Sequence, residues 1–243
     1  MKSWILITVR KFGYEIRKAP LPNFESAHVF DLAIHYLLAT RGVKLTFIEV
    51  GANDGEFGDP LRKYIVKYPW KGVLIEPQPD VFERLKVNYA GQDDRISFES
   101  VAISSNPGPI PLYRLPANSS NYGEFDSCVA SSNQQITAKQ LGVKLHELEK
   151  LMVPTARLDD IVTKHHLNFL DILQLDTEGF DWEVLQTLDL TKTRPLLVRF
   201  EHSHLSPKAI GRMTQHLNAH NYLVNYGGRE SDSIALRRDF IES

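Results

Sequence analysis

Acidic residues lie in or at the end of three apolar runs of this 243-residue sequence. Glu49 lies inside the run 45–52, Glu76 closes the run 72–76, and Asp176 closes the run 171–176. If these runs are parallel strands, their carboxyl ends meet at the edge of the sheet where ligands bind. Three carboxylates at that edge favour a ligand that carries positive charge.

The segment Phe47–Gly58 (FIEVGANDGEFG) predicts a turn that cradles a cofactor. Gly51 and Gly55 permit tight backbone turning and the close approach of a ligand. The glycine spacing is G-x-x-x-G-x-x-G, and Glu49 precedes the first glycine by two positions. A dinucleotide pyrophosphate favours G-x-G-x-x-G at a helix N-terminus with no acid beside it, so this turn suits a cationic ligand better.

Glu76 stands at the end of the second predicted strand. A carboxylate there accepts hydrogen bonds from ribose hydroxyls, which serves NAD and S-adenosylmethionine equally well. Asp176, Glu178 and Asp181 at the end of a later strand favour the second ligand, because a sulfonium and an α-ammonium are attracted to carboxylates.

The elements that must position these residues follow an α/β pattern. From Leu45 onward, short apolar runs alternate with segments of helical period, which predicts a parallel sheet. The link between the last two predicted strands is too short for a parallel crossover, so that pair is expected to be antiparallel. Strands are expected at 45–52, 72–76, 96–103, 153–158, 171–176, 196–201, 222–226 and 233–237, and helices around 61–68, 82–89, 137–150, 159–166, 180–188 and 207–221.

The stretch 104–133 differs in composition, since it is rich in Ser, Asn, Pro and Gly around one extended segment, 110–115. It is too long for a plain connection in a compact domain. We therefore expect the excursion 104–150 to form a lid or a wall of the ligand pocket.

Charge and cysteine content exclude several classes of protein. The sequence has 28 Lys and Arg against 30 Asp and Glu, a net charge of −2, so nucleic acid is not expected as a partner. The single cysteine, Cys128, cannot form an intramolecular disulfide, and no Cys/His cluster indicates structural zinc. A reducing compartment, the cytoplasm, is the expected location.

The first part of the chain, 1–40, is expected to be a basic, helical extension ahead of a main domain over 41–243. Its apolar run Trp4–Val9 is too short for a signal peptide or a membrane span. The basic segment Met1–Lys18 permits weak contact with an anionic membrane surface, although an element packed on the edge of the domain is the simpler interpretation.

Four motifs together resemble the FkbM family of S-adenosylmethionine-dependent methyltransferases: Ile48–Gly55, Ile75–Pro79, Pro154–Asp160 and Leu175–Asp181. The resemblance implies a three-layer, Rossmann-like class I methyltransferase fold, with a seven-stranded, mostly parallel sheet and an antiparallel last strand. It also implies methyl transfer to a hydroxyl oxygen of a sugar, a glycan or another small metabolite.

Residue by residue, the same resemblance assigns the cofactor site. The methionine part would be held by Glu49, Gly51, Asn53 and Gly55, the ribose by Glu76, and the adenine by Val101 and Ala102, with Asp54, Pro77 and Asp176 as further cofactor-binding residues.

A hydroxyl is a weak nucleophile, so a base is expected to take its proton. The strand end 199–204 supplies Glu201, His202 and His204, of which His202 is the first choice because an imidazole titrates near neutral pH. Glu178 and Asp176 complete the predicted catalytic set. The alternative is a divalent cation held by Asp176, Glu201 and His202, with Glu178 beside them, although no metal is expected to be required.

Two other functions fit parts of the pattern. One is an NAD-dependent oxidoreductase on a related fold, and the other is a binding module that keeps the cofactor site but has lost turnover. The intact glycine turn and Glu76 argue against the second.

Overall fold

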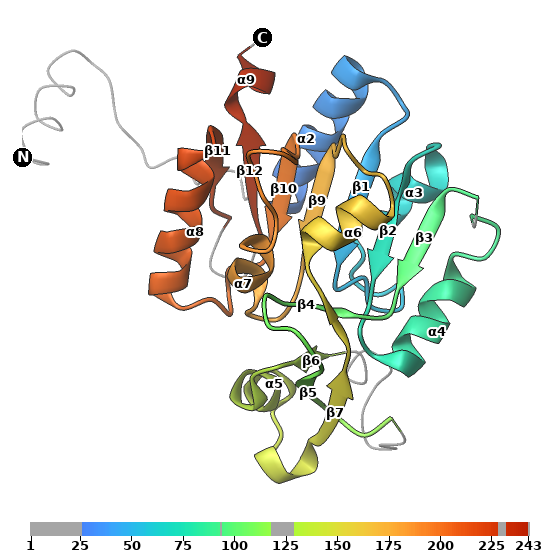
Figure 1. Cartoon of the computed structure of the whole chain (residues 1–243), viewed down its shortest axis with the longest axis vertical. Coiled ribbons are helices and arrows are strands. Elements are labelled where there is room, and N and C mark those ends of the chain that lie inside the picture. The colour runs from blue at the N-terminus through green and yellow to red at the C-terminus, as the bar shows by residue number, and fades with distance from the viewer. Residues whose placement is uncertain (1–25, 93, 118–128, 228–231, 243) are drawn as a thin grey trace, which may run out of the picture.

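A seven-stranded sheet forms the centre of the protein (Figure 1). The computed structural model describes residues 26–92, 94–117, 129–227 and 232–242. The strand order is β11-β12-β10-β9-β1-β2-β3, and neighbouring strands are parallel except where β12 pairs with β10 and β11. The predicted fold class is therefore confirmed. The strands are β1 (Thr46–Val50), β2 (Lys71–Ile75), β3 (Ile96–Glu99), β9 (Ile172–Leu175), β10 (Leu197–Phe200), β11 (Tyr222–Asn225) and β12 (Ser233–Arg237).

Helices cover both faces of the sheet and complete three layers. Successive strand residues point to opposite faces, so Phe47 of β1 packs into one hydrophobic core and Ile48 into the other. Because both faces are buried, the strands are continuous apolar runs, which is why the sequence reveals them. The Phe47 face carries α2 (Ser26–Arg41), α3 (Arg62–Lys67), α4 (Pro79–Asn88) and α9 (Arg238–Ile241), and the Ile48 face carries α6 (Leu158–Lys164), α7 (Asp181–Leu185) and α8 (Pro207–Ala219).

The helix α2 belongs to the packed core, because its residues Phe30, Ile34 and Leu37 are buried in the same cluster as Phe47. The expected domain boundary at residue 40 stays a prediction, and the basic segment Met1–Lys18 lies outside the described residues. Within the described ranges, no helix has the length and apolar character that crossing a bilayer requires.

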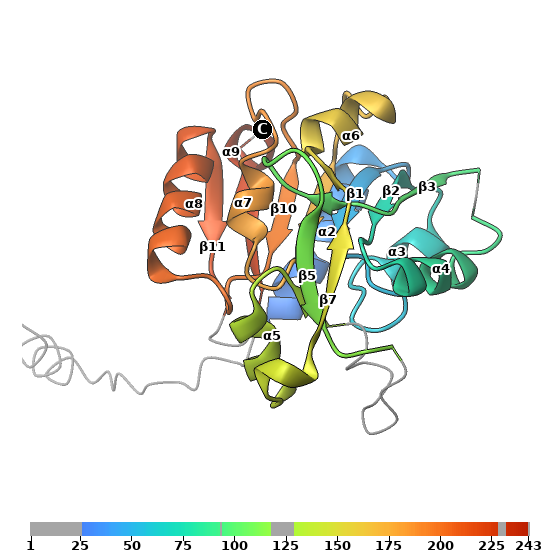
Figure 2. The same ribbon diagram turned by 60° about the horizontal axis from the view of Figure 1, so that its bottom comes forward.

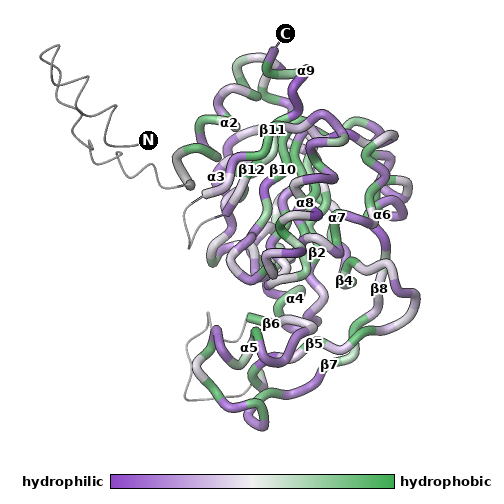
Figure 3. The backbone as a smooth tube through the Cα atoms, turned by 90° about the vertical axis from the view of Figure 1, so that its left-hand side faces the viewer, coloured by the Kyte–Doolittle hydropathy of each residue, from purple (hydrophilic) through white to green (hydrophobic). Residues whose placement is uncertain are grey.

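The excursion after β3 builds a small unit at the carboxyl-end edge of the main sheet (Figure 2). A short pair, β4 (Ala102–Ile103) with β8 (Thr155–Ala156), leads into a three-stranded sheet of order β6-β5-β7. Its members are β5 (Ile110–Arg114), β6 (Ala130–Ser131) and β7 (Glu149–Val153), beside α5 (Gln134–Leu141) and a short 3-10 helix (Leu145–Glu147). In Figure 3 this unit lies below the main sheet and its helical layers.

Three predicted elements in this region are wrong in their extent. The strand expected at 96–103 is two strands, because β3 ends at Glu99 and the chain then leaves the sheet to pair with β8. The helix expected at 137–150 ends at Leu141, since Gly142 adopts a left-handed φ of 66° and the chain continues into β7. The strand expected at 153–158 is interrupted at Pro154, which has no N–H to donate.

Arg114 of β5 joins the excursion to the main domain. Its guanidinium is buried and pairs with Glu149 at 2.8 Å, with Asp80 at the start of α4, and with the Gln78 side chain at 3.3 Å. Two carboxylates around one buried guanidinium form a strong, geometrically specific contact. The excursion is thereby held next to the turn that follows Glu76.

Gly51 sets how closely β1 approaches β9. Its φ is +81°, and a Cβ at this position would lie 1.8 Å from the carbonyl oxygen of Asp176. We expect Gly51→Ala to lower the free energy of unfolding by about 3 kcal/mol or more, because left-handed strain adds to a backbone collision. Urea unfolding measures this change.

The matched control is Gly58→Ala. Gly58 also has a positive φ, +69°, but no heavy atom of the described residues lies within 4 Å of its added Cβ. The free energy of unfolding of this variant is expected to fall by about 1 kcal/mol, from left-handed backbone strain alone. Equal losses in the two variants would show that the contact between Gly51 and Asp176 is unimportant.

Candidate active site

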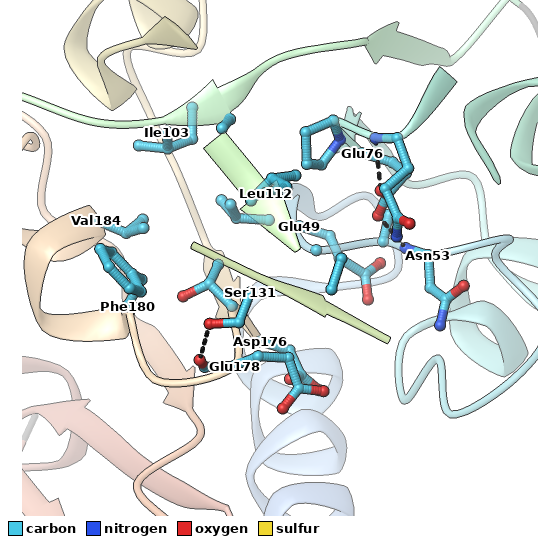
Figure 4. Close-up of a pocket in the computed structure, with 18 of the residues that line it drawn as sticks. Glu49, Asn53, Glu76, Ile103, Leu112, Ser131, Asp176, Glu178, Phe180 and Val184 are labelled. Carbon is cyan, nitrogen blue, oxygen red and sulfur yellow. Dashed lines mark hydrogen bonds between the residues drawn. The ribbon is translucent and has the colours of Figure 1, made fainter. Parts of the chain in front are cut away.

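A cavity of about 250 Å³ lies at the carboxyl ends of β1, β2 and β9, with the excursion as its outer wall (Figure 4). This is the edge at which parallel α/β sheets bind ligands. Four predicted acids line it: Glu49, Glu76, Asp176 and Glu178. Apolar side chains, among them Ile103, Leu112, Phe180 and Val184, also line it.

The turn after β1 links three strand ends. The N–H groups of Gly51 and Ala52 both donate to the carbonyl oxygen of Ile75 at 3.0 Å. Asn53, in a left-handed conformation with φ 53°, donates its N–H to Oε2 of Glu76 at 3.1 Å. Because Gly51 has no side chain, the carbonyl of Asp176 packs directly against it.

Glu76 is held in place by its own turn. Its Oε1 accepts the N–H of Gln78 at 2.9 Å and its Oε2 accepts the N–H of Asn53. Burial raises the pKa of Glu76 to about 7, against the effect of these hydrogen bonds. The carboxylate is therefore fixed before any ligand arrives.

Glu49 is buried, and its Oε2 has no hydrogen-bond partner among the described residues. Burial, and then the charge of Asp59, raise its pKa well above the usual range. Asp59 also lines the cavity, and its own carboxylate accepts the Tyr89 hydroxyl at 2.5 Å. A buried carboxylate oxygen without a partner is unfavourable, so this site accommodates a cationic group readily.

Asp176 follows β9 and lies beside Glu49 at the cavity wall. Burial raises its pKa well above the usual range, and repulsion from Glu201 and Asp181 adds to that shift. Arg199 opposes the shift only in part. Asp176 therefore keeps its proton to a higher pH than an ordinary aspartic acid does.

Glu178 and Asp181 have different roles in the β9–α7 turn. Glu178 lines the cavity, accepts the side-chain N–H of Gln140 at 3.0 Å through Oε1, and has a pKa raised by burial to about 7. Asp181 is fully buried and accepts bonds from Thr177 and from the N–H of Glu201. Asp181 therefore ties the turn to the end of β10 and does not line the cavity.

The described residues that line the cavity do not include His202, the first choice as base from the sequence. Its Nδ1 contacts the Ser233 hydroxyl at 2.9 Å, and its ring lies edge-on against Tyr226. The imidazole that approaches the acids is that of His204. Its Nε2 lies 3.5 Å from Oε2 of Glu178 and 3.4 Å from Oε1 of Glu201. The spacing Glu201-x-x-His204 is the only sequence signal for this contact.

The remaining predicted cofactor residues divide into two groups. Pro77, Val101 and Ala102 line the cavity with Asn53. Gly55 and Asp54 shape the turn instead: a Cβ on Gly55 would meet the Tyr89 ring at 2.5 Å, and Oδ1 of Asp54 accepts the N–H groups of Glu56 and Phe57. Sequence reasoning did not find the lining residues Asp59, Leu112, Val129 and Ser131, most of which reach the cavity from the excursion.

Comparison with known proteins finds methyltransferases. The family described as "Methyltransferase FkbM domain" matches residues 49–224. A protein named "Methyltransferase sdnD" from Sordaria araneosa is 27% identical over 161 residues, which are 58% of this chain and 60% of that protein. The chain thus spans less than two thirds of the length of this curated relative.

A solved structure shares the fold. The crystal structure of Methyltransferase FkbM from Methylobacillus flagellatus KT superposes with a TM-score of 0.52 at 14% identity, over 83% of this chain and 47% of that one. At this identity the likeness concerns the fold alone.

The acids of the cavity predict that the ligand-free protein loses stability as the pH rises. Burial raises the pKa of Glu76, Glu178 and Glu201 to about 7, about 7 and about 8, whereas an unfolded glutamate titrates at about 4.3. Between these values the folded state holds more protons than the unfolded state, so the free energy of unfolding falls as pH rises from about 4 to about 8.

Urea unfolding at pH values across this interval measures the effect, which amounts to about 1.4 kcal/mol for each unit of raised pKa. Glu201→Gln removes one of these carboxyl groups and is expected to flatten the profile. Stability that increases over the same interval would contradict the electrostatic description of the site.

Proposed function

The chain belongs to the FkbM methyltransferase domain family, and from that premise we propose that it transfers a methyl group from S-adenosylmethionine to a hydroxyl oxygen of a sugar, a glycan or another small metabolite. The observation that carries the proposal is the buried, unpartnered Oε2 of Glu49 in an acidic cavity at the carboxyl ends of β1, β2 and β9.

The donor set fits this cofactor. Glu49 offers an oxygen without a hydrogen-bond partner to a positively charged group, and Gly51 leaves room beside it. Glu76 presents a fixed carboxylate to ribose hydroxyls, while Val101 and Ala102 offer apolar surface to an adenine ring. When bound, S-adenosylmethionine supplies a methyl group on a positively charged sulfur.

The same residues disfavour a nicotinamide dinucleotide. Its pyrophosphate carries negative charge, whereas Glu49, Asp59 and Asp176 all line this cavity. Anionic groups are favoured where backbone N–H groups point at them. Here the N–H groups of Gly51 and Ala52 already donate to Ile75.

We assign the proton-accepting role to Asp176. In the transfer, the bond from the acceptor oxygen to the methyl carbon forms, the sulfur–carbon bond breaks, and the hydroxyl proton passes to a base. Asp176 lines the same cavity as Glu49, and its raised pKa makes its ionised form a stronger base than an ordinary carboxylate. His202 is engaged with Ser233 and Tyr226 instead.

Cofactor binding is tested with S-adenosylhomocysteine and NAD in a thermal-shift titration. S-adenosylhomocysteine is expected to raise the melting temperature of the chain, and Glu76→Gln to weaken its binding by about tenfold or more, because the ribose loses a charged acceptor. Stabilisation by NAD alone would contradict the proposal.

The matched control for Glu76 is Glu99→Gln. Glu99 also closes a strand of the sheet and is also buried, but its side chain pairs with Lys164 and His165 and does not line the cavity. Its substitution is expected to leave the affinity for S-adenosylhomocysteine unchanged. Equal losses of affinity for S-adenosylhomocysteine in Glu76→Gln and Glu99→Gln would indicate a general effect on folding.

Turnover is tested with labelled methyl transfer to fractionated glycans and metabolites. Asp176→Asn is expected to lower kcat by about 10²-fold or more, with a much smaller change in cofactor affinity. In the unsubstituted chain the rate should fall as the pH drops through the raised pKa of Asp176, because the protonated carboxyl cannot accept a proton.

Asp171→Asn is the control. Asp171 is buried just before the start of β9, and its carboxylate accepts hydrogen bonds from the N–H and the hydroxyl of Thr46. Undiminished turnover of Asp176→Asn would remove Asp176 from the mechanism. Binding of S-adenosylhomocysteine without labelling of any fraction would favour a binding module instead.

A further inference from the structure

Three metal-binding side chains meet at the edge of the cavity, and they come from two separate parts of the chain. Glu178 lies in the β9–α7 turn, Glu201 directly follows β10, and His204 lies in the loop before α8. One ligand atom from each lies within 4.8 Å of the others. Of the three, only Glu178 belongs to the lining of the cofactor cavity.

In each carboxylate of this trio one oxygen accepts a hydrogen bond and the other accepts none. Oε1 of Glu178 accepts from Gln140, and Oε1 of Glu201 accepts from Ser203. Oε2 of both residues is buried and has no hydrogen-bond partner among the described residues. Two buried carboxylate oxygens without hydrogen bonds destabilise the fold, and a bound cation would offset that penalty.

Among the described residues, the charges that act on the two glutamates of the trio are mostly negative. Asp181 and Asp232 act on both glutamates with negative charge, and Asp176 adds to them at Glu178. Arg199, at the end of β10, is paired with Asp232.

The backbone brings the two parts of the site together. Gly179 follows Glu178 with a φ of +92°, and a Cβ there would lie 3.2 Å from the carbonyl oxygen of His204 and 3.3 Å from its Cβ. The loop that carries His204 therefore closes directly onto the turn that carries Glu178. The trio is partly open to solvent, since the side chains of Glu178, Glu201 and His204 are 20%, 15% and 27% exposed.

We propose that Glu178, Glu201 and His204 bind a first-row divalent metal ion beside the cofactor cavity. Two carboxylates with one imidazole suit Mn²⁺, Fe²⁺ or Zn²⁺ better than Mg²⁺ or Ca²⁺, which prefer oxygen ligands alone. Three protein ligands leave coordination positions open for water or substrate.

The role of the ion rests on the proposed methyl transfer. Because Glu178 lines the cavity, an open coordination position there would take the acceptor hydroxyl and lower its pKa. The hydroxyl oxygen would then form the new bond to the methyl carbon as the sulfur–carbon bond breaks, and its proton would pass to Asp176. A catechol or a sugar diol, which offers two neighbouring oxygens, would occupy two open positions.

The site is tested first without cofactor or acceptor. The full chain, stripped with a chelator, is titrated with Mn²⁺ and followed by electron paramagnetic resonance, and one saturable site per chain is expected. His204→Ala and Glu201→Gln should each weaken Mn²⁺ binding by about 10-fold to 100-fold, while Mg²⁺ competes poorly. Urea unfolding of each variant confirms that it is folded.

The matched control is His165→Ala. His165 also contacts a glutamate, Glu99, but neither residue lines the cavity or belongs to the trio, so its loss should leave Mn²⁺ binding unchanged. Absence of a saturable site, or unaltered affinity in folded His204→Ala and Glu201→Gln, would overturn the proposal.

The role of the ion is tested separately by turnover. Methyl transfer is expected to stop after chelation and to recover with Mn²⁺, whereas binding of S-adenosylhomocysteine persists. Transfer that continues at full rate after chelation overturns the metal's role but leaves the methyltransferase proposal intact. Saturable Mn²⁺ binding without S-adenosylhomocysteine binding would reject the proposed function and keep the metal site.

Discussion

The close approach of Gly51 to the backbone of Asp176 is the constraint on which the rest of the site depends. With no side chain between them, the ends of β1 and β9 converge, and the turn after β1 also bonds Ile75 at the end of β2. Three carboxylates, those of Glu49, Glu76 and Asp176, are thereby brought to one cavity. Any residue with a Cβ at position 51 would separate the strands that carry them.

Concentrating these acids has an electrostatic cost that the fold offsets only in part. Backbone N–H groups donate hydrogen bonds to the carboxylate of Glu76, and Thr177 donates to that of Asp181. It leaves buried oxygens of Glu49, Glu178 and Glu201 without hydrogen-bond partners among the described residues. Such groups are stabilised by a proton, which is why their pKa values are raised, or by a bound cation. The sulfonium cofactor and the divalent ion that we propose would each neutralise part of this excess negative charge.

Much of the fold was predictable because its signals are local. Strands buried on both faces are continuous apolar runs, and the antiparallel final pair follows from the length of its link. The excursion was predicted poorly, since β4 pairs with β8 and β6 pairs with β5 across long stretches of chain. The helix expected to reach Lys150 ends at Leu141, because Gly142 after it adopts a left-handed conformation. That glycine was present in the sequence, but its conformation was not evident from it.

The sequence by itself determined which acids stand at strand ends, because chain order and apolar periodicity place Glu49, Glu76 and Asp176 at one edge of a parallel sheet. Only the tertiary structure decided which neighbouring side chains join them. His202 and His204 are two residues apart, yet one contacts Ser233 of β12 and the other contacts the acids. The direction of each ring is set by how the loop after β10 packs against the β9–α7 turn, a long-range contact that no local pattern encodes.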